Sequence, residues 1–364
     1  MQASQTCQQL REQILSMSMP LLDTPVAGLG VVKVSETPDG IFVVLSFGFP
    51  CDALELELLQ AVRDLPAALE LESTLDVKLE WKVKARAVSS GLTPLPGVAN
   101  IIAVASGKGG VGKSTTAVNL ALALAAAGAR CGILDADIYG PSQPRMLGIK
   151  DAHPQSDDGK TMDPLRAHGV EAMSVGFLVD EQEPMVWRGP MVTSALNQIL
   201  TQTRWGDLDY LIVDMPPGTG DIQLTLSQRV PVAGALIVTT PQDIALLDAR
   251  KGLKMFEKVG VPVLGVVENM SLHVCSNCGH EEAIFGTGGA DRLAQESGVN
   301  VLGQLPLDMQ IRKQADGGEP TVVAEPEGAI ARAYTRVALA MVAELAGQRE
   351  EHKHKFPKIV VENS

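Results

Sequence analysis

One short glycine-rich segment constrains the fold of this chain more than any other. Residues 107–115 read G-K-G-G-V-G-K-S-T, which fits the phosphate-binding pattern G-x-x-x-x-G-K-S. An apolar run at 100–105 precedes the segment and predicts a buried strand, and the Ala/Leu-rich stretch 115–128 after it predicts a helix. We therefore expect a loop whose backbone N–H groups hold a polyphosphate at the start of a helix. The expected contacts come from Gly107, Lys108, Gly109, Gly110, Val111, Gly112, Lys113, Ser114 and Thr115.

Three side chains of this loop have expected roles. Lys113 would reach the β- and γ-phosphates of a nucleotide, and the Ser114 hydroxyl would ligate Mg²⁺. Lys108 is unusual, because an ordinary loop of this kind has no basic residue directly after its first glycine. The string K-G-G-x-G-K-[ST] resembles the deviant Walker A motif of the MinD/ParA/nitrogenase-iron-protein class. This resemblance implies that Lys108 contacts the phosphates, often across a dimer interface, and that the protein is an ATP-dependent homodimer.

Composition limits the class of protein. The 364 residues are 45% hydrophobic and 20% charged, which is ordinary for a globular protein and long enough for two domains. No signal peptide and no run of membrane-spanning length is visible. An odd number of cysteines, five, favours a reducing cytoplasm, with thiols as ligands or core residues. The net charge of −13 disfavours nucleic acid and anionic lipid, so neither is expected as a partner.

The first 85 residues predict a small α+β domain. Helical spacing at 8–17 and 53–65, with strand patterns at 30–34, 41–45 and 77–83, gives the order helix, strand, strand, helix, strand. This order resembles the MIP18-like domain of iron-sulfur assembly proteins, in which a cysteine follows the second strand. Cys51 has that place, although a buried, inert cysteine is at least as good an interpretation. Residues 86–98 are expected to be a linker, 99–347 a second domain and 348–364 a flexible tail.

From residue 101 onward, predicted strands and helices alternate. Strands are expected at 131–134, 210–213, 235–238, 263–267 and 301–302. This alternation predicts an α/β fold with a doubly wound, mostly parallel sheet, in which ligands bind beyond the carboxyl ends of the strands.

Carboxylates stand at two of these strand ends. Asp214 follows the run 210–213 and is the expected Walker B residue, which holds Mg²⁺ through water. The glycine-bearing segment 215–221 after it resembles a switch loop, in which the Gly218 N–H can sense the γ-phosphate. Asp137 resembles the switch aspartate that positions the attacking water, but spacing alone does not separate it from Asp135. Asn269 resembles the asparagine that binds adenine in this class.

A C-x-x-C pair, Cys275 and Cys278, lies between two histidines at positions 273 and 280. Two thiolates make only half of a tetrahedral site, and the other cysteines offer no second pair. The histidines, a partner or a second copy of the chain must complete the site. A homodimer would supply four thiolates at a two-fold axis, which is the ligand set of a [4Fe–4S] cluster. A zinc site with His273 or His280, a redox dithiol and an inert pair remain as alternatives.

Several further segments closely resemble the Mrp/ApbC family over about residues 98–345. They are 135–142 (D-A-D-I-Y-G-P-S), 187–191 (W-R-G-P-M), 214–221 (D-M-P-P-G-T-G-D) and 268–271 (E-N-M-S), together with the C-x-x-C pair. The resemblance implies a P-loop ATPase that binds an iron-sulfur cluster and delivers it to apoproteins. The alternatives are a ParA/MinD-like positioning ATPase with a structural zinc at the cysteines, and a nickel-inserting NTPase.

Overall fold

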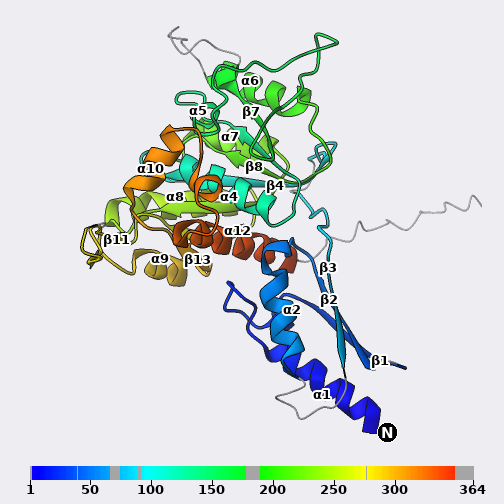
Figure 1. Cartoon of the computed structure of the whole chain (residues 1–364). Helices are drawn as coiled ribbons and strands as arrows, with labels where there is room; N and C mark the ends of the chain where they lie inside the picture. The colour runs from blue at the N-terminus through cyan, green and yellow to red at the C-terminus, as the bar shows by residue number, and fades with distance from the viewer. Residues whose placement is uncertain are drawn as a thin grey trace, which may run out of the picture.

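The fold is seen in a computed structural model that describes residues 2–38, 40–65, 74–88, 92–177, 189–275 and 277–348. Trp187, Arg188 and the expected tail beyond residue 348 lie outside the described residues. Two sheets of different size carry the chain, and a short two-stranded ribbon projects from the larger one (Figure 1).

The N-terminal unit has the predicted order of elements. These are α1 (Gln2–Ser16), β1 (Gly30–Thr37), β2 (Gly40–Phe47), α2 (Glu55–Arg63) and β3 (Leu75–Trp81), with 3-10 turns at Val26–Gly28 and Asp52–Leu54. Strand β2 is central, antiparallel to β1 and parallel to β3. Its alternate residues are buried, as expected for a strand with one face on a core. Leu10 and Ile14 of α1 belong to the same apolar cluster as Val43 and Leu45 of β2.

The larger sheet has eight strands in the order β13-β10-β9-β4-β8-β5-β7-β6. Their bounds are β4 (Val98–Ala105), β5 (Cys131–Asp135), β6 (Leu165–Ala167), β7 (Val170–Ser174), β8 (Leu208–Asp214), β9 (Val232–Thr239), β10 (Val263–Glu268) and β13 (Val301–Gln304). All neighbours are parallel except β6 and β7. Residues of β4, β5 and β9 are almost all buried because helices cover both faces.

Helices lie on both sides of this sheet (Figure 1). They are α4 (Lys113–Ala126), α5 (Gln143–Met146), α6 (Gly189–Gln202), α7 (Asp221–Arg229), α8 (Asp243–Lys258), α9 (Gly289–Ser297), α10 (Met309–Asp316), α11 (Thr321–Ala324) and α12 (Ala329–Gly347), with a 3-10 turn at Val175–Phe177. Apolar residues of α4 and α12 share one core cluster, and those of α6, α7, α8 and α9 share the other. The predicted doubly wound, mostly parallel α/β fold is confirmed.

The N-terminal unit packs directly on α4 and α12, and its apolar residues join their cluster. At the end of α4, the Asp52 N–H donates to the Ala127 carbonyl at 3.3 Å, and the Trp81 indole donates to the Asp52 carboxylate at 2.6 Å. A Cβ on Gly128 would lie 2.1 Å from that carboxylate, so only glycine allows this approach. An ion pair between Arg336 and Asp23 adds a polar contact at the edge.

Two features differ from the sequence expectations. The sequence does not predict strands β6 and β7, because β6 has only three residues and β7 carries a charged residue, Glu171, within its buried run. The phosphate-loop helix begins at Lys113, two residues before the predicted start. No helix among the described residues has the length and apolarity needed to cross a bilayer.

Candidate functional site

The glycine-rich loop connects the buried strand β4 to α4, as expected. Gly110 and Gly112 have φ values of +82° and +81°, a backbone region that favours glycine. Gly112 is also packed tightly, because a Cβ there would lie 2.1 Å from the side-chain nitrogen of Asn269. Position 112 therefore excludes any side chain for two independent reasons.

Lys113 forms a buried ion pair at the base of the loop. Its ammonium lies 2.5 Å from Asp214 Oδ1 and 3.1 Å from Ser114 Oγ. Lys113 is 6% exposed, and the Asp214 side chain is fully buried at the end of β8. The predicted Lys113, Ser114 and Asp214 thus lie together. The Ser114 hydroxyl and the Asp214 carboxylate both contact the Lys113 ammonium. Hydroxyl and carboxylate oxygens are also the ligand types that Mg²⁺ prefers.

Gln143, the first residue of α5, joins this group and was not singled out from the sequence. Its Nε2 donates to Asp214 Oδ2 at 2.9 Å and to the Ser114 carbonyl at 3.1 Å. The side chain is therefore a bridge between the phosphate loop and the end of β8. The only sequence signal for it was its place directly after the segment 135–142.

The geometry distinguishes Asp135 from Asp137. The fully buried Asp135 carboxylate accepts hydrogen bonds from the N–H groups of Asp137, Ser142 and Gln143 and from the Ser174 hydroxyl. Burial and the neighbouring Asp214 raise the pKa of Asp135 to about 7. Asp135 is thus engaged in holding the loop that follows it.

Asp137 is only half-buried, at the mouth of the same loop. Burial raises the pKa of its carboxyl, and the nearby Lys113 ammonium opposes that shift. Because its side chain is less enclosed than that of Asp135, Asp137 is the better placed of the two to meet a bound ligand.

The segment after Asp214 contacts the phosphate loop through Gly218. The Gly218 N–H donates to the Ser106 carbonyl at 3.0 Å, and φ at Gly218 is +97°. The Ser106 hydroxyl in turn donates to the Lys108 carbonyl at 2.9 Å. In this conformation the Gly218 N–H is thus paired, and it must leave Ser106 before it can contact a phosphate. Lys108 is half-buried beside this contact.

Asn269, at the end of β10, also contacts the phosphate loop. Its N–H donates to the Thr239 carbonyl at 2.8 Å, and its Nδ2 donates to the Val111 carbonyl at 2.9 Å. The side chain is 6% exposed. Its predicted contact with adenine stays a prediction, and the contact seen here is with the loop backbone.

The two cysteines lie on the ribbon formed by β11 (His273–Val274) and β12 (Glu281–Glu282). The Cys275 N–H donates to the His280 carbonyl, and the Gly279 N–H donates to the Cys275 carbonyl. Gly279 has φ +71°, which permits the turn. Backbone N–H groups of Asn277 and Cys278 lower the pKa of the Cys275 thiol. Such a turn stabilises a thiolate and suits it to bind a metal.

The ribbon does not complete a metal site by itself. Among the described residues, no group of three or more His, Cys, Asp or Glu side chains could hold a metal ion. The His273 ring is instead within hydrogen-bond distance of the Leu307 carbonyl, 2.9 Å from Nδ1. Cys278 is exposed, and Cys275 is partly exposed. In this conformation the described side chains therefore leave the ligand set of the cysteine pair incomplete.

The remaining cysteines have other environments. Cys51 and Cys131 are buried, and burial strongly raises the pKa of each thiol. The Cys51 thiol donates to the Phe49 carbonyl. A neutral, enclosed thiol is a poor metal ligand, which favours the inert interpretation of Cys51.

Short backbone contacts connect the ribbon to the nucleotide end of the sheet. After Asn269, the Ser271 N–H donates to the Leu305 carbonyl at 3.0 Å. The Leu307 N–H donates to the Leu272 carbonyl at 2.8 Å, next to the His273–Leu307 contact. Only residues 270–274 separate Asn269, which bonds the phosphate loop, from Cys275, and three of them are held by these contacts.

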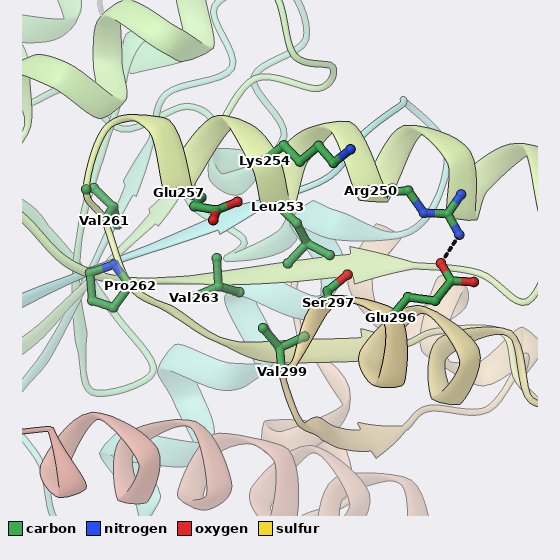
Figure 2. A pocket seen from close by; sticks show the side chains of 11 residues that line it. Arg250, Leu253, Lys254, Glu257, Val261, Pro262, Val263, Glu296, Ser297 and Val299 are labelled. Carbon is green, nitrogen blue, oxygen red and sulfur yellow. Dashed lines mark hydrogen bonds and ion pairs between the residues drawn. The ribbon is translucent and has the colours of Figure 1, made fainter.

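A cavity of about 720 Å³ lies elsewhere, between α8 and α9 (Figure 2). Val263, the first residue of β10, lines it together with Val261 and Val299, and an ion pair between Arg250 and Glu296 lies at one side. The cavity is therefore at the amino ends of the strands, whereas ligands of such sheets bind at the carboxyl ends. Its lining contains none of the predicted nucleotide or cluster residues.

Comparisons with known proteins agree with this geometry. Residues 97–342 match the family model described as ParA: NUBPL iron-transfer P-loop NTPase. An iron-sulfur cluster carrier protein of Haemophilus influenzae is 51% identical over 352 residues, which cover 95% of this chain and 92% of the relative. The carrier protein of Escherichia coli K12 is 61% identical over 70% of this chain and 69% of its own length. The iron-sulfur cluster transfer protein NUBPL of Mus musculus is 53% identical over 71% and 81%.

Solved structures give the same picture. A nucleotide-binding protein of Archaeoglobus fulgidus in complex with ADP has a TM-score of 0.56 and 37% identity, covering 64% of this chain and 90% of its own. The cell division ATPase MinD of Pyrococcus furiosus has a TM-score of 0.50 at 23% identity, covering 67% and 98%. The second likeness concerns the fold alone.

Proposed function

The chain belongs to the ParA/NUBPL family of iron-transfer P-loop NTPases, and from this premise we propose that it is an ATP-dependent carrier of iron-sulfur clusters. The nucleotide end of the sheet would bind and hydrolyse ATP. The cysteine ribbon would hold the cluster as cargo and release it to apoproteins in the cytoplasm. The Haemophilus influenzae relative that carries this name matches 95% of the chain, which supports the proposal.

The nucleotide is held by groups already in place. Backbone N–H groups of residues 107–115 would surround the phosphates at the N-terminus of α4, with Lys108 at the edge of the loop. Lys113 would exchange the Asp214 carboxylate for the β- and γ-phosphates. Mg²⁺ would then be held by the Ser114 hydroxyl and, through water, by Asp214, and it would neutralise charge on the phosphates.

Hydrolysis requires a positioned water, and Asp137 is the residue we assign to it. The water would attack the γ-phosphorus, the bond to the β-γ bridging oxygen would break, and ADP and phosphate would result. Gly218 would leave the Ser106 carbonyl to contact the γ-phosphate, which makes the segment 215–221 sensitive to the nucleotide. A rearrangement of this kind before each turnover fits slow hydrolysis coupled to transfer.

We assign the cluster to a homodimer, with Cys275 and Cys278 of each copy as its four thiolate ligands. Cys278 is exposed and Cys275 is partly exposed, and the described part of the chain offers no third ligand beside them. Exposed apolar residues on α8, Ile244 and Leu247, add a surface that a second copy could bury. Asp248 of the same helix packs against Gly107, so this surface borders the phosphate loop.

One observation carries the proposal: a pair of accessible cysteines, which offers half the ligands of a cluster, lies a few residues along the chain from Asn269, whose side chain bonds the phosphate loop. Cargo release needs only ligand exchange, in which acceptor thiolates replace Cys275 and Cys278 without a change of oxidation state. A nucleotide-dependent shift at Asn269 could alter ribbon geometry and thereby open the cluster to that exchange.

The test is anaerobic reconstitution with iron and sulfide, followed by transfer to an apo-ferredoxin with and without ATP. We expect four irons and four sulfides per dimer, and transfer that depends on ATP. A colourless protein that retains one zinc per chain would contradict the carrier function and favour a positioning ATPase. Cluster transfer at the same rate with and without ATP would contradict the coupling of hydrolysis to transfer, but it would not contradict the carrier function.

A further inference from the structure

Gln143 is buried at the centre of the nucleotide site, with 1% of its surface exposed. Its Nε2 lies within hydrogen-bond distance of two groups, the Asp214 carboxylate and the Ser114 carbonyl. Both are acceptors only, so the amide nitrogen must face them and the amide oxygen must point elsewhere. The hydrogen-bonding partners therefore fix which end of the Gln143 amide is nitrogen and which is oxygen.

The amide oxygen, Gln143 Oε1, is buried and has no hydrogen-bond partner among the described residues. The neighbouring Ser142 Oγ is in the same situation. Buried polar atoms in native structures rarely stay unpaired unless a water, an ion or a ligand supplies the partner. Two such atoms on consecutive residues, next to Asp214 and Ser114, indicate that part of this site is filled by something other than protein.

The backbone that carries both atoms is tightly held. The Asp135 carboxylate accepts the N–H groups of Ser142 and Gln143 at 2.9 and 3.1 Å, and the Ser174 hydroxyl donates to the same oxygen. The backbone of Gln143 is therefore fixed, and its side chain can turn toward another protein partner only by breaking the Nε2 bonds to Asp214 and Ser114. The missing partner of Oε1 must come to it.

That partner has to be a hydrogen-bond donor or a cation, because an amide oxygen can only accept a hydrogen bond or ligate a metal ion. Mg²⁺ in nucleotide sites keeps several waters, and these waters are strong donors. We propose that Gln143 is a positioning residue for Mg²⁺: its Nε2 orients the Asp214 carboxylate, and its Oε1 accepts from a water of the magnesium hydration shell. The inference rests on the proposed binding of Mg·nucleotide and assigns a new residue to it.

The test measures how nucleotide affinity depends on Mg²⁺. The probe is ADP with a fluorescent anthraniloyl group on the ribose, titrated into the full chain with EDTA and over a series of Mg²⁺ concentrations. Gln143→Met removes the amide and keeps the volume. Gln314→Met on α10 is the matched control, because Gln314 Oε1 is also without a partner while its Nε2 bonds Glu325.

We expect Gln143→Met to raise the Mg²⁺ concentration for half-maximal binding by about 10-fold or more, since residues behind a metal ligand typically change metal affinity by that factor. Affinity in EDTA should stay within about twofold of wild type, and Gln314→Met should leave both values unchanged. Equal losses with and without Mg²⁺, or no shift at all, would overturn the assignment.

A second variant and the behaviour of the wild type distinguish a misfolded protein and a failure of nucleotide binding from a failure of the role of Gln143. If Gln143→Met does not fold, Gln143→Asn replaces it, because the shorter side chain keeps the amide but withdraws it from the site. We expect Gln143→Asn to raise the Mg²⁺ concentration for half-maximal binding by less than the factor given for Gln143→Met. An unchanged Mg²⁺ requirement would again overturn the role of Gln143. If the wild type itself does not bind the ADP probe, the proposed nucleotide function fails rather than the role of Gln143.

Discussion

The nucleotide end of the sheet and the cysteine ribbon differ in completeness. At the nucleotide end, Lys113, Asp214 and Gln143 are buried and bonded to one another within one chain. On the ribbon, Cys278 is exposed and Cys275 is partly exposed, and no third ligand among the described residues joins them. The difference shows that the groups around the phosphate loop are preorganised, whereas the cysteine pair needs further ligands to bind a metal, which a second copy of the chain would supply in the proposed carrier.

The largest expected effect is the loss of the cluster from a variant that still binds nucleotide. Cys275→Ser/Cys278→Ser should lose all bound iron and sulfide on anaerobic reconstitution, because no other described side chain can replace the thiolates. Its affinity for ADP should stay within about twofold of wild type, since neither cysteine contacts the phosphate loop. Cys7→Ser, at a half-buried cysteine of the N-terminal unit, should retain the cluster. Iron retained by the double variant would show that Cys275 and Cys278 are not the cluster ligands.

A second variant acts only at the nucleotide end. Asp214→Asn should lower ATP hydrolysis by about 100-fold, or about 2.7 kcal/mol in the barrier, because it removes the charge that holds Mg²⁺. Cluster content measured by visible absorbance should not change. Asp209→Asn is the control, at the opposite end of the same strand, where Asp209 pairs with Arg130. A loss of cluster in Asp214→Asn would mean that the two regions are not independent.

A third variant removes the hydrogen bond between Asn269, which lies just before the cysteine ribbon in sequence, and the phosphate loop. Asn269→Ala leaves the buried Val111 carbonyl without its partner and should weaken ADP binding by about 10-fold. It should also reduce the effect of ATP on cluster transfer, measured as the ratio of transfer rates with and without ATP. Asn119→Ala provides the control, because Asn119 is equally buried and bonds Thr115 and Val322 on the side away from the ribbon. Equal behaviour of both variants would refute a specific role for Asn269.

The last prediction concerns stability rather than binding or catalysis. Asp135 ionises near pH 4 in the unfolded chain and near pH 7 in the folded one, so the folded state binds more protons between these values. The free energy of unfolding of the nucleotide-free protein should therefore fall as pH rises from about 4 to about 7, by at most about 1.4 kcal/mol per unit from this group. Asp137 shifts in the same direction. Urea titrations across this range should show a flatter profile for Asp135→Asn, and an unchanged profile would exclude Asp135 as the cause.

Much of the fold and of the nucleotide site could be predicted because the signals are local. The glycine loop, its strand and its helix are continuous in sequence, and Asp214 follows a run that is apolar enough to be recognised as a buried strand. The order of elements in the N-terminal unit follows in the same way from periodicity.

The remaining features depend on contacts between distant segments. Gln143 meets Asp214 across 71 positions of sequence, and Asn269 meets Val111 across 158. No spacing rule encodes such pairs, since tertiary packing brings them together. Asp135 and Asp137 could not be separated for the same reason, because the difference lies in which backbone N–H groups each carboxylate receives.

The docking of the N-terminal unit on α4 has a mechanical consequence. Helix α4 has 14 residues, about 21 Å of stiff rod, with the phosphate loop at one end and the Asp52–Gly128 contact just beyond the other. Any tilt of the rod caused by phosphate binding would be largest as a displacement at its far end. Because Asp52 packs closely against Gly128, such a tilt would carry the N-terminal unit with the helix, and the orientation of that unit would then report phosphate binding.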